Sequence, residues 1–375
     1  MPKKAKRLPE LDVLRATAIL FLQFYFIGYT FVNTQNTDPY YFYWLGQFGL
    51  ALFFFVSGFA IDLNNRDIRT REDAGKFFKK RAKRIYPLYW LALGVVVLAP
   101  ALYRMAISGT LTIPNPGAIA LAVTYVVGAQ ELFSLVINGY VYLWFVSAIL
   151  ILYAIYPVIA RYSADKAIGR NIKNLLAVST IIFGIFLAVN YVFSIMEYRF
   201  FLYYYIFMSG IVVNRTNIFN TKVNSRRLTV VFLAIFAVTV AYQILFAPHV
   251  YDPQFESLAG ITARWLIYIP IDLLLIFAIF HLARNYYNVL DSRIQAAISY
   301  VAYASYPMYL FFALFLGGTA IFLEHYDASK FLILAAQIFV GLPISIVISF
   351  NLQRLADRII PRSKPKNNEK SSSQI

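Results

Sequence analysis

The chain has 375 residues, of which 60% are apolar and only 14% charged, with a mean hydropathy of +0.62. A soluble domain this apolar would aggregate, so we expect a protein that lies in a lipid bilayer. The net charge of +16 does not indicate nucleic-acid binding, because the basic residues lie between apolar stretches and not on one soluble surface. The lack of Cys excludes disulfides and thiolate chemistry, and three isolated His residues give no recognisable metal site.

Ten apolar stretches are candidates for membrane-spanning helices, nine of them close to the roughly 20 residues that a bilayer requires. They cover residues 11–33, 41–62, 86–106, 140–160, 174–196, 228–247, 261–283, 296–322 and 331–350, with a shorter tenth at 200–213. The sequence therefore predicts an all-α integral membrane protein. We expect it to have about ten transmembrane helices.

The distribution of basic residues predicts that both termini are cytoplasmic. With ten spans, all but five of the 34 Lys and Arg residues fall on the side of the N-terminus, as the positive-inside rule requires. The stretch 118–137 is also apolar, but an eleventh span there would place the basic loops 161–173 and 214–227 outside. We therefore expect residues 107–139 to form a re-entrant or surface segment on the outer side.

The chain is predicted to hold one transmembrane domain over residues 1–360 and no soluble domain. Residues 361–375 are rich in Lys, Pro, Asn and Ser, which predicts a disordered basic cytoplasmic tail. No inverted repeat of the kind common in secondary transporters is visible in the sequence.

Asp12 and Arg15 lie three residues apart at the start of the first span, so their side chains share one face of the helix. Charged groups at membrane depth are costly and usually face a polar cavity or each other. Two interpretations stay open: a pair that lines a channel at its cytoplasmic mouth, and a structural pair that reaches back to the membrane interface.

The basic segment 73–84 predicts an amphipathic helix on the cytoplasmic surface. We expect Asp73 to be its N-cap, and the helix to end before Tyr86-Pro87, because Pro blocks continuation of a helix. One interpretation is an anchor to anionic lipids. The other uses Arg81 and Arg84, three apart on one face, to bind phosphates of a cytosolic ligand.

Asp272 lies in the middle of the span predicted at 261–283, two residues after Pro270. A carboxyl group at this depth is a candidate for chemistry. A structural role, with a protonated carboxyl hydrogen-bonded to a Tyr of a neighbouring helix, is the alternative.

Several motifs together resemble the acyltransferase-3 superfamily of membrane acyltransferases. They are LDVLRATA at 11–18, GLALFFFVSGF at 49–59, FKKRAKRIYPLYW at 78–90 and LWF at 143–145, with a weaker match in SYPMYL at 305–310. Each motif alone is weak, but their order and spacing extend along almost the whole chain.

The resemblance implies ten helices and acyl-CoA as the donor substrate, with acetyl-CoA favoured and no bound cofactor. The acyl group would pass from the cytosol to a hydroxyl of a cell-surface or lipid-linked glycan, at the plasma membrane. The residues that would contact the donor by resemblance are Arg81, Arg84 and Lys80. Those that would line the channel are Asp12, Arg15, Ser57 and Trp144.

The chain departs from the family pattern at three positions where family members carry His. Phe26 occupies the position of the general base, and Tyr142 and Phe312 occupy the other two. Phe cannot accept a proton, and an ordinary Tyr is a poor base at neutral pH. Asp272 is the candidate alternative base, and the catalytic residue is otherwise unknown.

Three functions follow as alternatives. The first is a membrane acyltransferase whose partners are the bilayer, acyl-CoA and a glycan or glycolipid acceptor. The second is a relative that has lost its base and acts as a glycolipid-binding or scaffolding protein. The third is a transporter.

Overall fold

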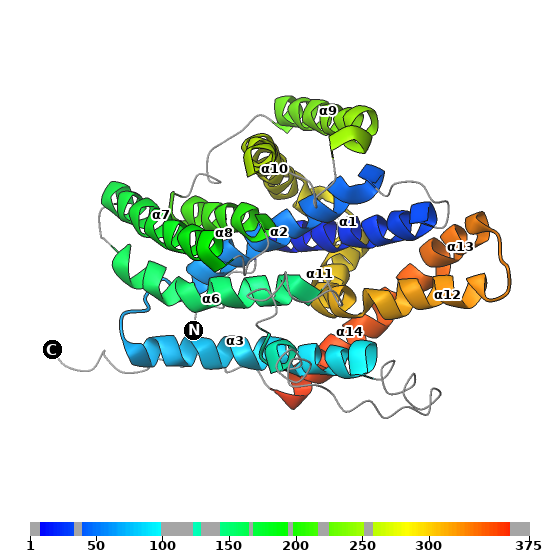
Figure 1. Cartoon of the computed structure of the whole chain (residues 1–375), viewed down its shortest axis with the longest axis horizontal. Coiled ribbons are helices and arrows are strands. Elements are labelled where there is room, and N and C mark those ends of the chain that lie inside the picture. Colours follow the sequence, from blue (N-terminus) through cyan, green and yellow to red (C-terminus); the bar gives the residue numbers. More distant parts are fainter. Residues whose placement is uncertain are drawn as a thin grey trace.

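The computed structural model describes residues 8–33, 40–98, 123–128, 143–164, 168–193, 198–216, 225–250 and 258–360. Figure 1 shows these ranges as a bundle of helices, and no strand occurs within them (Figure 1). The prediction of an all-α membrane protein is therefore confirmed.

The first half of the bundle begins with α1 (Pro9–Asn33) and α2 (Tyr40–Asn65), followed by α3 (Arg71–Ala92) with a π-helical extension, η1 (Leu93–Leu98). After the next described stretch come α6 (Trp144–Tyr162), α7 (Ile168–Phe193) and α8 (Tyr198–Thr216). Figure 1 shows α1 and α2 at the centre of the bundle, and α3 along its lower edge beside α6.

The second half contains α9 (Ser225–Val250), α10 (Leu258–Tyr286), a 3₁₀ turn η5 (Tyr287–Val289) and α11 (Ser292–Phe312). It continues through η6 (Ala313–Gly317), α12 (Gly318–Glu324), α13 (Lys330–Ala336), η7 (Gln337–Gly341) and α14 (Leu342–Ile359). The two π-helical segments η6 and η7 join neighbouring helices without a break, so α11 to α12 and α13 to α14 form two long apolar rods.

Within the described residues, seven stretches are long and apolar enough to cross a membrane. They are Pro9–Phe31, Phe42–Asn65, Trp144–Tyr162, Gly169–Phe193, Ile267–Val289, Ser292–Glu324 and Lys330–Ile359. Each coincides with a predicted span, which confirms a multi-pass membrane protein. The span predicted at 200–213 is not among them, and those at 86–106 and 228–247 extend beyond the residues whose side chains the structure describes, so the count of ten stays a prediction.

Close helix packing explains the glycine of the SGF motif. A Cβ atom at Gly58 of α2 would collide with the carbonyl oxygen of Phe207 in α8, and one at Gly210 of α8 would collide with the carbonyl oxygen of Phe55. Small residues that let two backbones approach closely are typical of membrane helix interfaces. These glycines therefore fix the position of α2 against α8. Ser57, the neighbour of Gly58 in α2, is thereby held in a fixed position as well.

The helix α3 differs from its prediction at both ends. Thr70, not Asp73, is the N-cap: the Thr70 hydroxyl accepts a hydrogen bond from the Asp73 N–H at 3.1 Å, and the Asp73 carboxylate accepts one from the Thr70 N–H at 3.1 Å. This reciprocal pair is a capping box. The hydrogen bonds from Thr70 also lower the pKa of the Asp73 carboxyl group.

The predicted end of this helix before Tyr86-Pro87 was wrong, because α3 continues through Pro87 to Ala92. An interior Pro costs a helix about 3 kcal/mol. The structure offsets this cost with buried side chains beyond Pro87, among them Leu88 and Tyr89. The basic segment and the start of the predicted third span are therefore one rigid helix.

Three side chains near the end of α3 bind the short helical turn at residues 123–128. Tyr86, Tyr89 and Trp90 donate hydrogen bonds to the carbonyl oxygens of residues 127, 125 and 126, at 2.7 to 2.9 Å. Part of the stretch predicted as re-entrant or surface, 107–139, thus folds back along α3. The rest of that stretch and the predicted tail at 361–375 lie outside the described residues.

Candidate functional site

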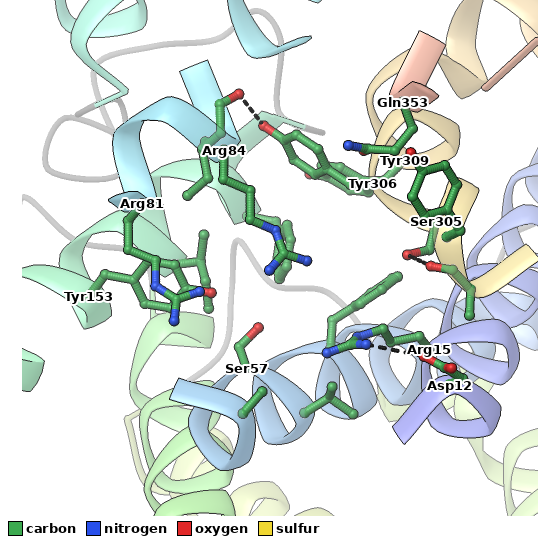
Figure 2. A pocket seen from close by; sticks show the side chains of 18 residues that line it. Asp12, Arg15, Ser57, Arg81, Arg84, Tyr153, Ser305, Tyr306, Tyr309 and Gln353 are labelled. Atoms are coloured by element: carbon green, nitrogen blue, oxygen red, sulfur yellow. Dashed lines mark hydrogen bonds and ion pairs between the residues drawn. The ribbon is translucent and has the colours of Figure 1, made fainter. Parts of the chain in front are cut away.

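The residues described by the structure enclose a cavity of about 570 Å³ between five helices. Its walls come from α1, α2, α3, α6 and α11, with Gln353 from α14 at one edge (Figure 2). Among the predicted site residues, Asp12, Arg15, Ser57, Arg81 and Arg84 line it together. The fold thus gathers into one space residues that are up to 72 positions apart in the sequence.

The charges in the cavity favour an anionic ligand. Three arginines, Arg15, Arg81 and Arg84, face one aspartate, Asp12, which leaves a net charge of +2. Arg15 donates to the Asp12 carboxylate at 3.3 Å, so the predicted pair does form on one face of α1. Figure 2 shows the guanidinium groups of Arg81 and Arg84 on the side of the cavity opposite this pair.

Arg81 is held in place by aromatic rings. Its guanidinium carbon lies 5.5 Å from the ring centre of Phe77 and 5.3 Å from that of Tyr153, which are cation–π distances. Its buried Nε–H donates to no acceptor among the described residues, although an Arg N–H is a strong donor. A guanidinium that is held in position and has an N–H group without an acceptor is suited to binding phosphate or carboxylate oxygens.

Arg84 lies one turn further along α3, and its side chain is exposed, so it marks the open mouth of the cavity. The neighbouring Ile85 carbonyl accepts a hydrogen bond from the Tyr306 hydroxyl at 3.0 Å. This bond ties α3 to α11 directly at the cavity. The basic face of α3 therefore has a fixed position relative to the spanning helices.

Two predicted residues lie outside the cavity lining. Lys80 is exposed on α3, and partial desolvation of its ammonium group, together with the charges of Arg81 and Arg84, lowers its pKa. Trp144 is buried at the start of α6, where its ring packs 5.6 Å from that of Tyr203 and lies under the guanidinium of Arg199. Its neighbour Phe145 is the residue that faces the cavity.

Two of the positions where the resemblance expects His are in contact with each other. The rings of Phe26 in α1 and Phe312 in α11 stack with centroids 3.4 Å apart and an interplanar angle of 4°. The third position, Tyr142, lies outside the described residues. The two Phe residues that stand where the resemblance expects His thus form one apolar stack.

Asp272, the candidate alternative base, is fully buried in α10 and does not line the cavity. Neither carboxyl oxygen has a hydrogen-bond partner among the described residues, so the structure identifies no Tyr partner for the structural alternative. Its role as a base stays a prediction. Within the described residues there is also no cluster of His, Asp and Glu that could hold a metal ion.

A buried ionic cluster at the ends of α2 and α8 was not predicted. Asp62 is 0% exposed, and its Oδ1 accepts from Nε and Nη2 of Arg215 at 3.0 and 2.9 Å and from the Tyr156 hydroxyl at 3.1 Å. Its Oδ2 accepts from Asn214 at 2.8 Å and from Arg66 at 3.3 Å. The carboxylate is therefore satisfied on both oxygens.

The same cluster reaches two further helices through Arg215. Its Nη1 donates to the Ser163 hydroxyl at 2.6 Å and to the Asn171 side-chain oxygen at 2.9 Å. Four helices, α2, α6, α7 and α8, thus meet at one buried ion pair. Since α2 and α6 also line the cavity, this cluster fixes the frame on which the cavity is built.

Comparison with known protein families gives one match. A family described as an acyltransferase domain, acyltransferase-3, matches residues 8–352. A search of curated proteins and a search of solved structures found no match. The match covers nearly the whole chain, and the chain belongs to this family. The class of protein is thus a multi-pass membrane protein of acyltransferase type, as the motifs predicted.

Proposed function

We propose that the protein transfers an acyl group, acetyl being favoured, from acyl-CoA to a hydroxyl of a cell-surface or lipid-linked glycan at the plasma membrane. The cavity holds the donor: Arg81 and Arg84 bind its phosphates at the mouth, and the acyl thioester extends between the spanning helices. Asp12, Arg15 and Ser57 line its path. Family membership supports the reaction type, and the residues of the cavity support the donor.

The observation that carries this proposal is Arg81. Its guanidinium is fixed between Phe77 and Tyr153, and its buried Nε has no partner among the described residues. A buried donor left unsatisfied costs about 1 to 3 kcal/mol, so an anionic ligand that supplies the missing acceptor is favoured there. A lipid anchor alone does not require an arginine directed into a cavity.

The stacked pair Phe26–Phe312 favours the second function, a family relative without its catalytic base. The two functions share donor binding and differ in turnover. Purified protein in lipid nanodiscs, supplied with radiolabelled acetyl-CoA and a panel of glycolipid acceptors, separates them. Acyl transfer above the rate without protein supports the enzyme, and donor binding without transfer or hydrolysis supports the binding protein.

Changing Arg81 and Arg84 together to Ala is expected to weaken acetyl-CoA binding about a hundredfold, because each lost charge-assisted hydrogen bond contributes at least about 1.5 kcal/mol. The loss should shrink as the salt concentration rises, since Arg84 is exposed and its charge is screened. Isothermal titration calorimetry at two salt concentrations measures both effects.

The matched control is Lys76 and Lys79, two exposed cations of the same helix that do not line the cavity, both changed to Ala. They remove equal charge from α3, so a general electrostatic effect would weaken binding equally in both double variants. Unchanged affinity in the arginine variant, with the protein still folded, would leave only the lipid anchor for the basic face of α3.

A further inference from the structure

Three aromatic rings meet at one end of the cavity. Phe53 of α2, Phe145 of α6 and Tyr309 of α11 all line it. The ring of Phe145 lies 5.8 Å from that of Phe53 and 5.0 Å from that of Tyr309, both at angles typical of aromatic contacts. We call these three residues the aromatic floor.

The floor lies opposite the arginines. On α6, Tyr153 contacts Arg81, Ile149 lies one turn away and Phe145 a second turn away. Eight residues of helix correspond to about 12 Å, which sets the distance along α6 between the arginine end and the floor. The mouth is exposed at Arg84, whereas Phe145 and Tyr309 are only 7% and 3% exposed.

Surrounding aromatic side chains pack against the floor. The ring of Phe54 packs edge-on against Phe145 with centroids 4.9 Å apart, and stacks on Tyr203 at 4.7 Å. On α11, the residue one turn beyond Tyr309 is Phe312, which stacks on Phe26. A ligand that enters past the arginines therefore reaches the aromatic floor, and the Phe26–Phe312 stack lies one turn of α11 beyond it.

We infer that the aromatic floor limits the length of the donor's acyl chain and makes the protein selective for short acyl groups. This inference rests on the proposed function, in which the phosphates of the donor bind at the arginine end. The acyl group is then the part of the donor that reaches the floor. A longer chain would overpack the cavity, whereas removal of a ring would create apolar space that added methylene groups can fill.

The test measures the affinities of the protein for CoA, acetyl-CoA, butyryl-CoA and octanoyl-CoA by isothermal titration calorimetry in nanodiscs. All ligands are kept below the critical micelle concentration of octanoyl-CoA. The wild type should bind octanoyl-CoA at least about fivefold more weakly than acetyl-CoA, which corresponds to the low end of the cost of overpacking. Phe145→Ala should reverse this order. Its affinity should rise about fourfold for each methylene that enters the new space, since a buried CH₂ contributes about 0.8 kcal/mol.

Two further variants keep the test decisive. Phe145→Leu removes less volume, so it should favour butyryl-CoA even if the Ala variant does not fold. Phe183→Ala removes a ring of equal size from α7, where it packs on Phe201 and Tyr204 away from the cavity, and should leave the chain-length preference unchanged.

The results distinguish a failure of the aromatic floor from a failure of the proposed donor site. If CoA and acetyl-CoA bind but octanoyl-CoA binds more tightly to the wild type, or the Phe145 variants keep the wild-type order, the aromatic floor does not set chain length and the donor site stands. If neither CoA nor acetyl-CoA binds the folded wild type, the proposed donor is wrong and the inference fails with it.

Discussion

Phe26→His is expected to raise acyl transfer, or hydrolysis of the donor, by about 10²- to 10⁴-fold, the contribution that general-base catalysis typically makes. The substitution places an imidazole, with an ordinary pKa of about 6.5, where the family resemblance expects the base. The new ring can keep its place against Phe312, because His is also planar and aromatic. Release of free CoA from acetyl-CoA, with and without a glycolipid acceptor, measures the gain.

The control for this substitution is Phe24→His, which places the same group two residues away on an exposed part of α1. It should leave the rate unchanged, because a base must reach the proton that it removes. Clear turnover in the wild type, loss of it in Asp272→Asn and no gain in Phe26→His would instead identify Asp272 as the base.

Removing the carboxylate of Asp62 is expected to destabilise the protein by about 3 to 5 kcal/mol, because Asp62→Leu leaves the charge of Arg215 buried without a counter-ion. The partner is almost fully enclosed, since the side chain of Arg215 is only 2% exposed. Denaturant unfolding in detergent and recovery of folded protein after heating both report this loss.

Two companion variants separate the buried charge from the lost contacts. The double variant Asp62→Leu with Arg215→Met removes both charges, and it should be more stable than Asp62→Leu alone. Glu72→Gln breaks the exposed pair between Glu72 and Lys76 and should change stability by less than about 1 kcal/mol. Equal stability of Asp62→Leu and the wild type would show that the cluster does not hold the four helices together.

Local spacing was enough to predict part of the site. Asp12 and Arg15 are three residues apart, as are Arg81 and Arg84, and helix geometry alone places each pair on one face. Hydropathy predicted the helices for the same reason, because apolar length is a local property of the chain. The end of α3 was missed because burial of Leu88 and Tyr89 outweighs the cost of Pro87, and burial is a property of the fold.

Contacts between distant residues could not be predicted in this way. Asp62 and Arg215 are 153 positions apart, and Phe26 and Phe312 meet only because α1 packs on α11. A weak signal for the first pair existed, because each charge lies at the same end of its predicted span. The aromatic floor gave no sequence signal, since Phe and Tyr are common throughout this chain.

The most direct measurement of the central claim, that the cavity binds acyl-CoA, is protection of a single thiol in its wall. The chain has no Cys, so Ser57→Cys creates one reactive group in the cavity. A maleimide should label it, and an acetyl-CoA analogue with a non-reactive ketone in place of the thioester should slow the labelling about tenfold at about ten times its Kd. Thr216→Cys, on the exposed end of α8, should react at the same rate with and without the analogue. Equal labelling of Ser57→Cys at saturating analogue would contradict a donor site in this cavity.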